Sequence, residues 1–180
     1  LAATEGDARA LIIGAIQRGL VRADDLAHWI EARQPRGRRV LRRALVEAMA
    51  GVWSVPEGDL IALLCTSTVL PEPIANPFLE DDCGRRLTTP DVWIDDVALA
   101  VMVHSRQFHE GVDQWEQTVM SDTDLTAARV VVVTVTPASL ASNPASILRR
   151  VEAAYVEARR IGFRAPVRAT PRHGPIRPAS

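Results

Sequence analysis

Residues Val130–Val135 are five valines and one threonine, a run with no alternation between apolar and polar side chains. β-branched side chains favour strands, and an uninterrupted run of them predicts a strand buried on both faces. Val97–Val103 is a second near-continuous apolar run, short enough to be a buried strand. Strands buried in this way need helices over their sheet, so the two runs predict an α/β fold.

The first fifty residues predict helices, because apolar residues recur at helical spacing from Ala8 onward. We expect Asp24 to cap the second helix, and the third helix to run from about Arg38 to Ala50. Ser54 precedes Glu57 by three residues, which is the spacing of a capping box. Glu57 is therefore expected in the first turn of a fourth helix.

Beyond Pro73 the pattern predicts strands over Ile74–Leu79 and Arg86–Ile94, the latter paired with Val97–Val103 through an Asp95-Asp96 turn. A helix is expected from about Val112 to Ala127, and Asn143 should cap a final helix. The predicted organisation is a helical arm over 1–53, an α/β core over 54–162 and a flexible, Arg/Pro-rich tail over 163–180.

Composition narrows the possible chemistry. The chain has 180 residues, 47% of them hydrophobic, and all 21 basic residues are arginine. The absence of lysine excludes a P-loop lysine, a Schiff-base lysine and a Ser-Lys dyad. There is no signal peptide pattern, no apolar run of about 18 residues and no Cys-x-x-Cys pair, so we expect a cytoplasmic protein without a membrane span. Because Leu1 is not an initiator, we expect sequence to precede it.

Charge is unevenly distributed although the formal net charge is only -1. Six arginines and no acid lie in Arg33–Arg43, whereas acids gather in Glu80–Asp82 and Asp91–Asp96. Such separation permits a polyanion partner on one surface and a metal ion on another, the alternative being solvated helix faces.

Two acidic residues, Glu57 and Asp91, are candidate metal ligands. Glu57 begins a helix expected beside the sheet, and Asp91 lies on the predicted hairpin. Several carboxylate oxygens at short range are what Mg²⁺ and Mn²⁺ prefer, and such ions support phosphodiester hydrolysis. Glu57 has an alternative role as a capping-box partner.

Five segments in order resemble a known family: the Arg-Arg-Ala-Leu helix at Arg42–Leu45, then Ser54–Glu57, Pro90–Trp93, Ala100–His109 and Val133–Pro137. Over roughly Arg22–Arg160 the chain resembles actinobacterial proteins with a domain like the very-short-patch-repair endonuclease, of the PD-(D/E)XK superfamily. The resemblance implies a restriction-endonuclease-like core, in which a central mixed sheet is flanked by helices. It also implies an N-terminal arm like that of abortive-infection antitoxins.

The same resemblance assigns site residues. Glu57 matches the helix carboxylate of the family, Asp91 the strand aspartate, and His109 a histidine that follows the second catalytic strand. That strand usually reads Glu-x-Asp or Glu-x-Lys, but here it reads Met102-Val103-His104. Methionine offers no oxygen to Mg²⁺, so cleavage is expected to be impaired.

Three functions remain open from the sequence. The first is a degenerate nuclease fold that binds nucleic acid or regulates, with no metal needed. The second is an active Mg²⁺- or Mn²⁺-dependent DNA endonuclease using Glu57 and Asp91, with Asp95 or Asp96 as a displaced third ligand. The third is a regulator or antitoxin-like module that acts through contacts with a partner protein or with duplex DNA.

Two further residues have alternative roles. Met102 is expected either at the degenerate ligand position or simply in the core. His104 is either a softer metal ligand or a surface histidine. The candidate nucleic-acid contacts are Arg36, Arg38, Arg39, Arg42, Arg43, Arg106 and Gln107.

Overall fold

The computed structural model describes residues 4–49, 51–104 and 122–172. The chain divides into two compact units, and the boundary between Gly58 and Asp59 lies inside a helix. This boundary falls five residues beyond the end of the predicted arm. No helix in the described ranges is long and apolar enough to cross a bilayer.

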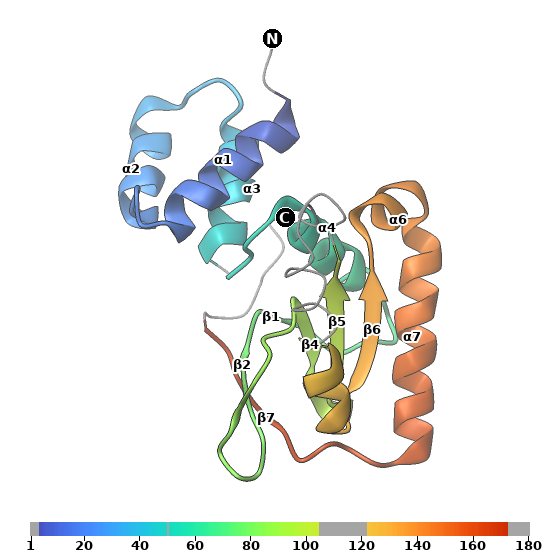
Figure 1. The fold of residues 1–180 in the computed structure, drawn as a ribbon. Helices are drawn as coiled ribbons and strands as arrows, with labels where there is room; N and C mark the ends of the chain where they lie inside the picture. Colours follow the sequence, from blue (N-terminus) through green and yellow to red (C-terminus); the bar gives the residue numbers. More distant parts are fainter. Residues whose placement is uncertain (1–3, 50, 105–121, 173–180) are drawn as a thin grey trace, which may run out of the picture. The chain divides into compact units, whose positions relative to one another are not determined.

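The first unit contains three helices and the start of a fourth, as predicted (Figure 1). Their bounds are α1 Glu5–Gln17, α2 Ala23–Arg33, α3 Arg38–Met49 and α4 Val55–Leu64. One detail of the prediction is wrong: Asp24 does not cap α2. Arg22 holds the capping position without a side-chain hydrogen bond, and Asp24 lies inside the first turn. There its negative charge suits the positive end of the helix dipole.

A buried ion pair joins α1 to α3. The Arg9 side chain is 6% exposed, and its Nε and Nη2 donate to the two carboxylate oxygens of Glu47 at 3.1 and 2.8 Å. The Glu47 carboxylate also accepts from Nε of Arg43 at 3.0 Å. Because Arg9 is removed from water, this fork-shaped pair fixes the register of α1 on α3.

Replacing Glu47 with alanine should lower the free energy of unfolding by about 3 kcal/mol, because a buried guanidinium loses its bidentate acceptor. The matched control is Arg160→Ala, which breaks the exposed Arg160–Glu157 pair and should cost less than about 1 kcal/mol. Urea denaturation followed by far-UV circular dichroism measures both changes. Equal losses in the two variants would contradict the stabilising role of the buried pair.

The described residues of the second unit form two sheets. The first has four strands in the order β1 (Ile74–Ala75), β4 (Val92–Ile94), β5 (Leu99–Val103) and β6 (Val131–Val135). The second has three strands in the order β3 (Arg86–Leu87), β2 (Phe78–Glu80) and β7 (Arg168–Thr170). The two long strands predicted over Ile74–Leu79 and Arg86–Ile94 are thus each divided between the two sheets. At the first division Asn76 adopts a positive φ of 44°.

The four-stranded sheet is mixed. β4 and β5 form the predicted antiparallel hairpin, joined by a 3-10 turn over Asp95–Val97, and β5 runs parallel to β6. Parallel neighbours need a crossover, and part of it is a helix over 122–127, whose end agrees with the predicted Ala127. The structure therefore shows a mixed α/β architecture.

The strand buried on both faces is β5 rather than β6. Its first four residues are buried, whereas Thr134 of β6 is exposed and Val131 and Val132 are half-buried. Among the strands that the structure describes, β6 lies at the edge of the sheet, with a neighbour on one side only. The valine run thus marks a strand correctly, but its composition does not reveal its place in the sheet.

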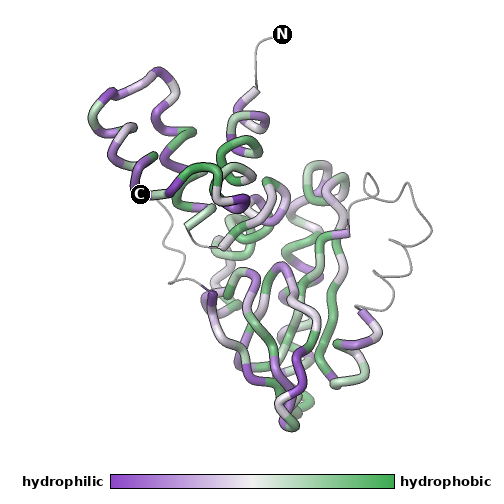
Figure 2. The backbone as a smooth tube through the Cα atoms, turned by 60° about the vertical axis from the view of Figure 1, so that its left-hand side comes forward, coloured by the Kyte–Doolittle hydropathy of each residue, from purple (hydrophilic) through white to green (hydrophobic). Residues whose placement is uncertain are grey.

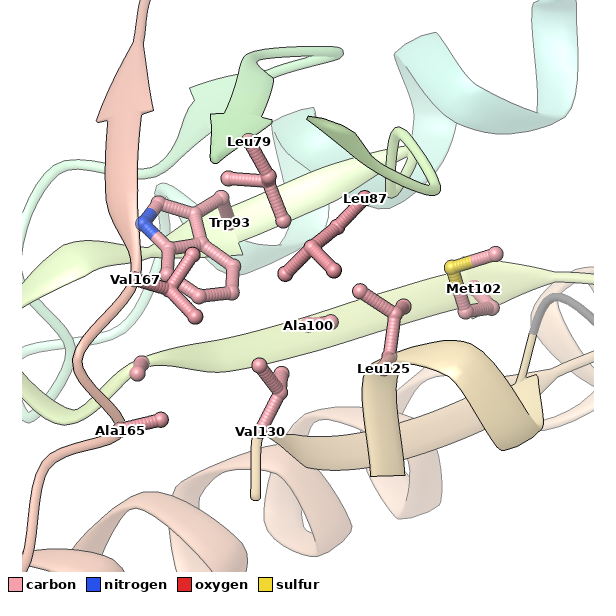
Figure 3. Packing of buried hydrophobic residues seen from close by; sticks show 10 residues of the cluster. Leu79, Leu87, Trp93, Ala100, Met102, Leu125, Val130, Ala165 and Val167 are labelled. Atoms are coloured by element: carbon pink, nitrogen blue, oxygen red, sulfur yellow. The ribbon is translucent and has the colours of Figure 1, made fainter. Parts of the chain in front are cut away.

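One apolar cluster lies between the two sheets and the helix over 122–127 (Figure 3). Leu79 and Leu87 come from the three-stranded sheet, and Trp93 and Ala100 come from the four-stranded sheet. Leu125 of the helix covers the end of the cluster next to Met102. This packing joins both sheets into a single core.

The remaining elements are α6 (Pro137–Ser142), which the sequence analysis missed, and α7 (Pro144–Ile161). Asn143 caps α7 by accepting from the backbone amide of Ser146, as predicted. The segment predicted as a flexible tail is instead partly a strand, because residues 168–170 form β7 and pair with β2. Burial of Ala165 and Val167 in the core accounts for this order.

Candidate functional site

Asp91 lies directly before β4, and its side chain bridges the hairpin. Oδ2 accepts a hydrogen bond from the backbone amide of Val103 at 2.6 Å, and its carbonyl accepts from the amide of Asn76 at 3.1 Å. Val92 pairs with Val101, so Met102 is the next residue of β5 opposite Asp91. The structure thus brings together Asp91 and the strand segment that the resemblance assigned to metal binding.

Met102 occupies the position of the expected glutamate and is 9% exposed. Its side chain belongs to the apolar cluster, near Leu125 (Figure 3). A core methionine was one of the two roles expected from the sequence, and the packing supports it. A carboxylate in the same place would lose hydration, which disfavours its charged form.

His104 follows β5 and extends its pairing with β6, since its amide donates to the carbonyl of Val135 at 2.8 Å. Its Nε2 lies 3.4 Å from Oδ1 of Asp122. The side chain is 19% exposed, so it is neither a core residue nor a fully solvated one. The histidine therefore has a carboxylate neighbour that the sequence analysis did not identify.

Glu57 is 7% exposed and, as its spacing predicted, its side chain accepts hydrogen bonds at the start of α4, although the backbone donor is the amide of Trp53 rather than that of Ser54. The Ser54 hydroxyl donates to Oε1 at 2.7 Å, and the Trp53 amide donates to Oε2 at 2.8 Å. Both carboxylate oxygens thus serve the start of α4, which favours the capping role over that of a metal ligand. Glu57 belongs to the first unit, and Asp91 to the second.

Asp95 and Asp96 do not approach Asp91. Asp95 lies four residues away across the extended strand β4, a span of about 13 Å at about 3.3 Å per residue. Oxygens that share one ion each lie about 2.0–2.6 Å from it, so Asp91 and Asp95 cannot both be ligands. This contradicts the displaced-ligand version of the active nuclease.

The two turn aspartates have structural partners instead. Oδ1 of Asp95 accepts from the Trp93 indole at 2.9 Å and from Nη2 of Arg164 at 3.0 Å. Oδ2 of Asp96 accepts from the Tyr155 hydroxyl at 2.8 Å, which ties the hairpin turn to α7. Both carboxylates therefore hold the fold together.

The arginines of the arm differ in how far their charge is already neutralised. Arg42 donates hydrogen bonds to both carboxylate oxygens of Glu31, and Arg43 donates to Glu47. Arg38 donates only to the neutral amide oxygen of Gln34, and within the described ranges Arg36 and Arg39 form no ion pair. The free positive charge is thus concentrated near the connection between α2 and α3. The other candidates, Arg106, Gln107 and His109, lie outside the described residues.

In the described part of the chain, one group of three potential metal ligands has its ligand atoms within 4.8 Å of one another: Asp81, Asp82 and Cys83. The backbone amide of Arg85 donates to Asp81 and lowers the pKa of that carboxyl. The charge of Asp82 raises the pKa of the Cys83 thiol, which keeps it protonated and a poor ligand. The three residues thus belong to an exposed turn between β2 and β3, and their contacts are those of the turn.

An open cleft of about 470 Å³ lies beside this turn. Its lining includes Arg164 and Arg168, which are paired with Asp95 and Glu80 respectively. Because Asp95 is at the opposite end of β4 from Asp91, the cleft is separate from the predicted site.

Comparison with protein-family models, with curated proteins and with solved structures gave no match.

Sequence reasoning missed two aspartates at the helix over 122–127. Asp122 lies against His104, and Asp124 accepts from Arg85 at 2.9 Å and from the Thr88 amide at 3.1 Å. Sequence spacing gave no signal for them, because their partners are 18 to 39 residues away along the chain. Only the tertiary fold brings Asp122 to the end of β5 and Asp124 to the residues around β3.

Asp91→Ala should lower the free energy of unfolding by about 2 kcal/mol, because the Val103 amide loses a charged acceptor. Asp91→Asn keeps an acceptor oxygen and should cost less than half as much. Urea unfolding curves of the two variants test this difference, and equal losses would contradict it. The asparagine variant is then the proper test of charge in any activity assay.

Proposed function

We propose that this chain is a degenerate PD-(D/E)XK nuclease-fold protein that binds nucleic acid without efficient cleavage. The observation that carries the proposal is the burial of Met102 in the core at the end of the hairpin that holds Asp91. A mixed sheet with helices is compatible with a restriction-endonuclease-like core. The family resemblance links that architecture to DNA.

Two further observations support impaired cleavage. The oxygens of Glu57 accept hydrogen bonds within a helix cap, and Asp95 is too far from Asp91 to replace the missing ligand. Asp91 and His104 remain on the hairpin as candidate metal contacts. Among the described residues they do not form part of a close group of three ligands. Mg²⁺ or Mn²⁺ would therefore bind weakly here.

Cleavage of supercoiled plasmid in Mg²⁺ and in Mn²⁺ tests the proposal. Native protein should nick no faster than Asp91→Asn. Met102→Glu should introduce metal-dependent nicking, and Met102→Gln, which has the same shape and no charge, should not. Circular dichroism establishes that each variant is folded.

Efficient nicking by native protein that disappears in Asp91→Asn would overturn the proposal and favour the active endonuclease. A partner-binding regulator remains the other alternative, and it predicts neither nicking nor affinity for duplex DNA.

DNA affinity should depend on salt through the arm. Arg36→Gln with Arg38→Gln should reduce the slope of log K against log salt concentration by about two, since each phosphate contact contributes about 0.9. Fluorescence anisotropy with a labelled duplex measures the slope. The control is Arg149→Gln with Arg160→Gln, on α7, which should leave it unchanged. An unaltered slope in the arm variant would exclude these arginines as phosphate contacts.

A further inference from the structure

The helices α2 and α3 form an antiparallel hairpin with a connection of four residues, 34–37. Arg42 of α3 donates to Glu31 of α2 at 2.6–2.9 Å, which aligns the two helices. The start of α2 and the end of α3 therefore both lie away from the connection. The helical hairpin thus has a connection end and an opposite, open end.

One stripe of α3 faces outward. Arg39, Arg42, Val46 and Met49 follow one another at intervals of three and four residues, which places them on one side of the helix. Val46 is 38% exposed and Met49 is 50% exposed, although both are apolar. The opposite side of α3 contains the buried residues Ala44 and Ala48, and the third buried residue, Leu45, lies at the border of the stripe beside Met49. Along the three helices of this unit, hydrophilic and hydrophobic stretches alternate (Figure 2).

The two ends of this face carry opposite charge. Asp24 lies seven residues, or two turns, before Glu31 and so shares its side of α2, next to α3. Arg39 lies three residues before Arg42, at the connection end. Within the described ranges neither Asp24 nor Arg39 has a charged partner. At 1.5 Å per residue the two are about 15 Å apart along the hairpin axis.

We propose that this face of the helical hairpin is a homodimer interface. A two-fold axis perpendicular to the helices, halfway between Arg39 and Asp24, brings Arg39 of each copy onto Asp24 of the other. The same axis crosses the face near Val46, so Val46 of one copy meets Val46 of the other at its centre, whereas Met49 lies level with Asp24 and so next to Arg39 of the other copy.

A second copy of the chain fits this face better than DNA does. Phosphates would be repelled by Asp24 and would leave Val46 and Met49 in water. A second copy satisfies both charges and buries both apolar side chains. The inference does not depend on the proposed function, because it concerns only the arm.

Sedimentation equilibrium of the full chain tests the proposal. Native protein should be dimeric. Asp24→Arg and Arg39→Glu should each weaken dimerisation at least about tenfold, since each change places like charges together twice per dimer. An equimolar mixture of the two variants should restore association, because each cross-pair is again of opposite sign. Arg149→Glu on α7 is the control and should leave the dimer intact.

The mixture also guards against a folding defect, since misfolded variants would not recover association on mixing. A native protein that is monomeric at 100 µM overturns the proposal. So does a dimer that survives both charge reversals, or a mixture of folded variants that stays monomeric.

Discussion

The organisation of the second unit depends on the enclosure of β5. This strand pairs antiparallel with β4 on one side and parallel with β6 on the other, so its backbone groups have partners at both edges. Its first four side chains are buried. Enclosure of this kind gives a strand one register, because a shift by one residue would exchange its two faces. The position of β5 therefore fixes the turn that precedes it and the helix over 122–127 that leads into its parallel neighbour β6.

The same enclosure limits what the end of β5 can do chemically. Met102 is the last buried residue of the strand, and it packs beside Leu125. A metal-binding carboxylate at this place needs hydration or an ion to offset its desolvation. An apolar side chain needs neither, and it contributes packing energy instead. The packing of Met102 and its inability to bind Mg²⁺ thus both follow from its apolar side chain.

The carboxylates that were candidate metal ligands from the sequence accept hydrogen bonds from the protein itself in the structure. Glu57 caps a helix, Asp91 closes the hairpin through the Val103 amide, and Asp96 holds the turn to α7. Each satisfies a donor that would otherwise be left without a partner, at a cost of about 1–3 kcal/mol. A free-energy cost of this size is enough to explain why acidic residues stand at these positions, and no bound metal ion is needed to explain them. Asp91 is compatible with both roles, which is why its asparagine variant is informative.

Local signals in the sequence were sufficient for much of the fold. Helix spacing, the contact between Ser54 and Glu57, the Asn143 cap and the Asp95-Asp96 turn each involve residues within a few positions, and the structure has all of them. Apolar composition also located β5 and β6. Such features depend on backbone geometry and nearest neighbours, which the sequence specifies directly.

Tertiary structure decided the rest, because it depends on partners far apart in the chain. Composition could not show that β5 is central and β6 an edge, or that residues 168–170 would pair with β2. It could not place Asp122 beside His104, or separate Asp95 from Asp91 by the length of β4. The sequence alone shows that residue 102 is a methionine, which offers no oxygen to a metal ion. Packing then determined that the residue serves the core, because burial there rewards an apolar side chain and penalises a charged one.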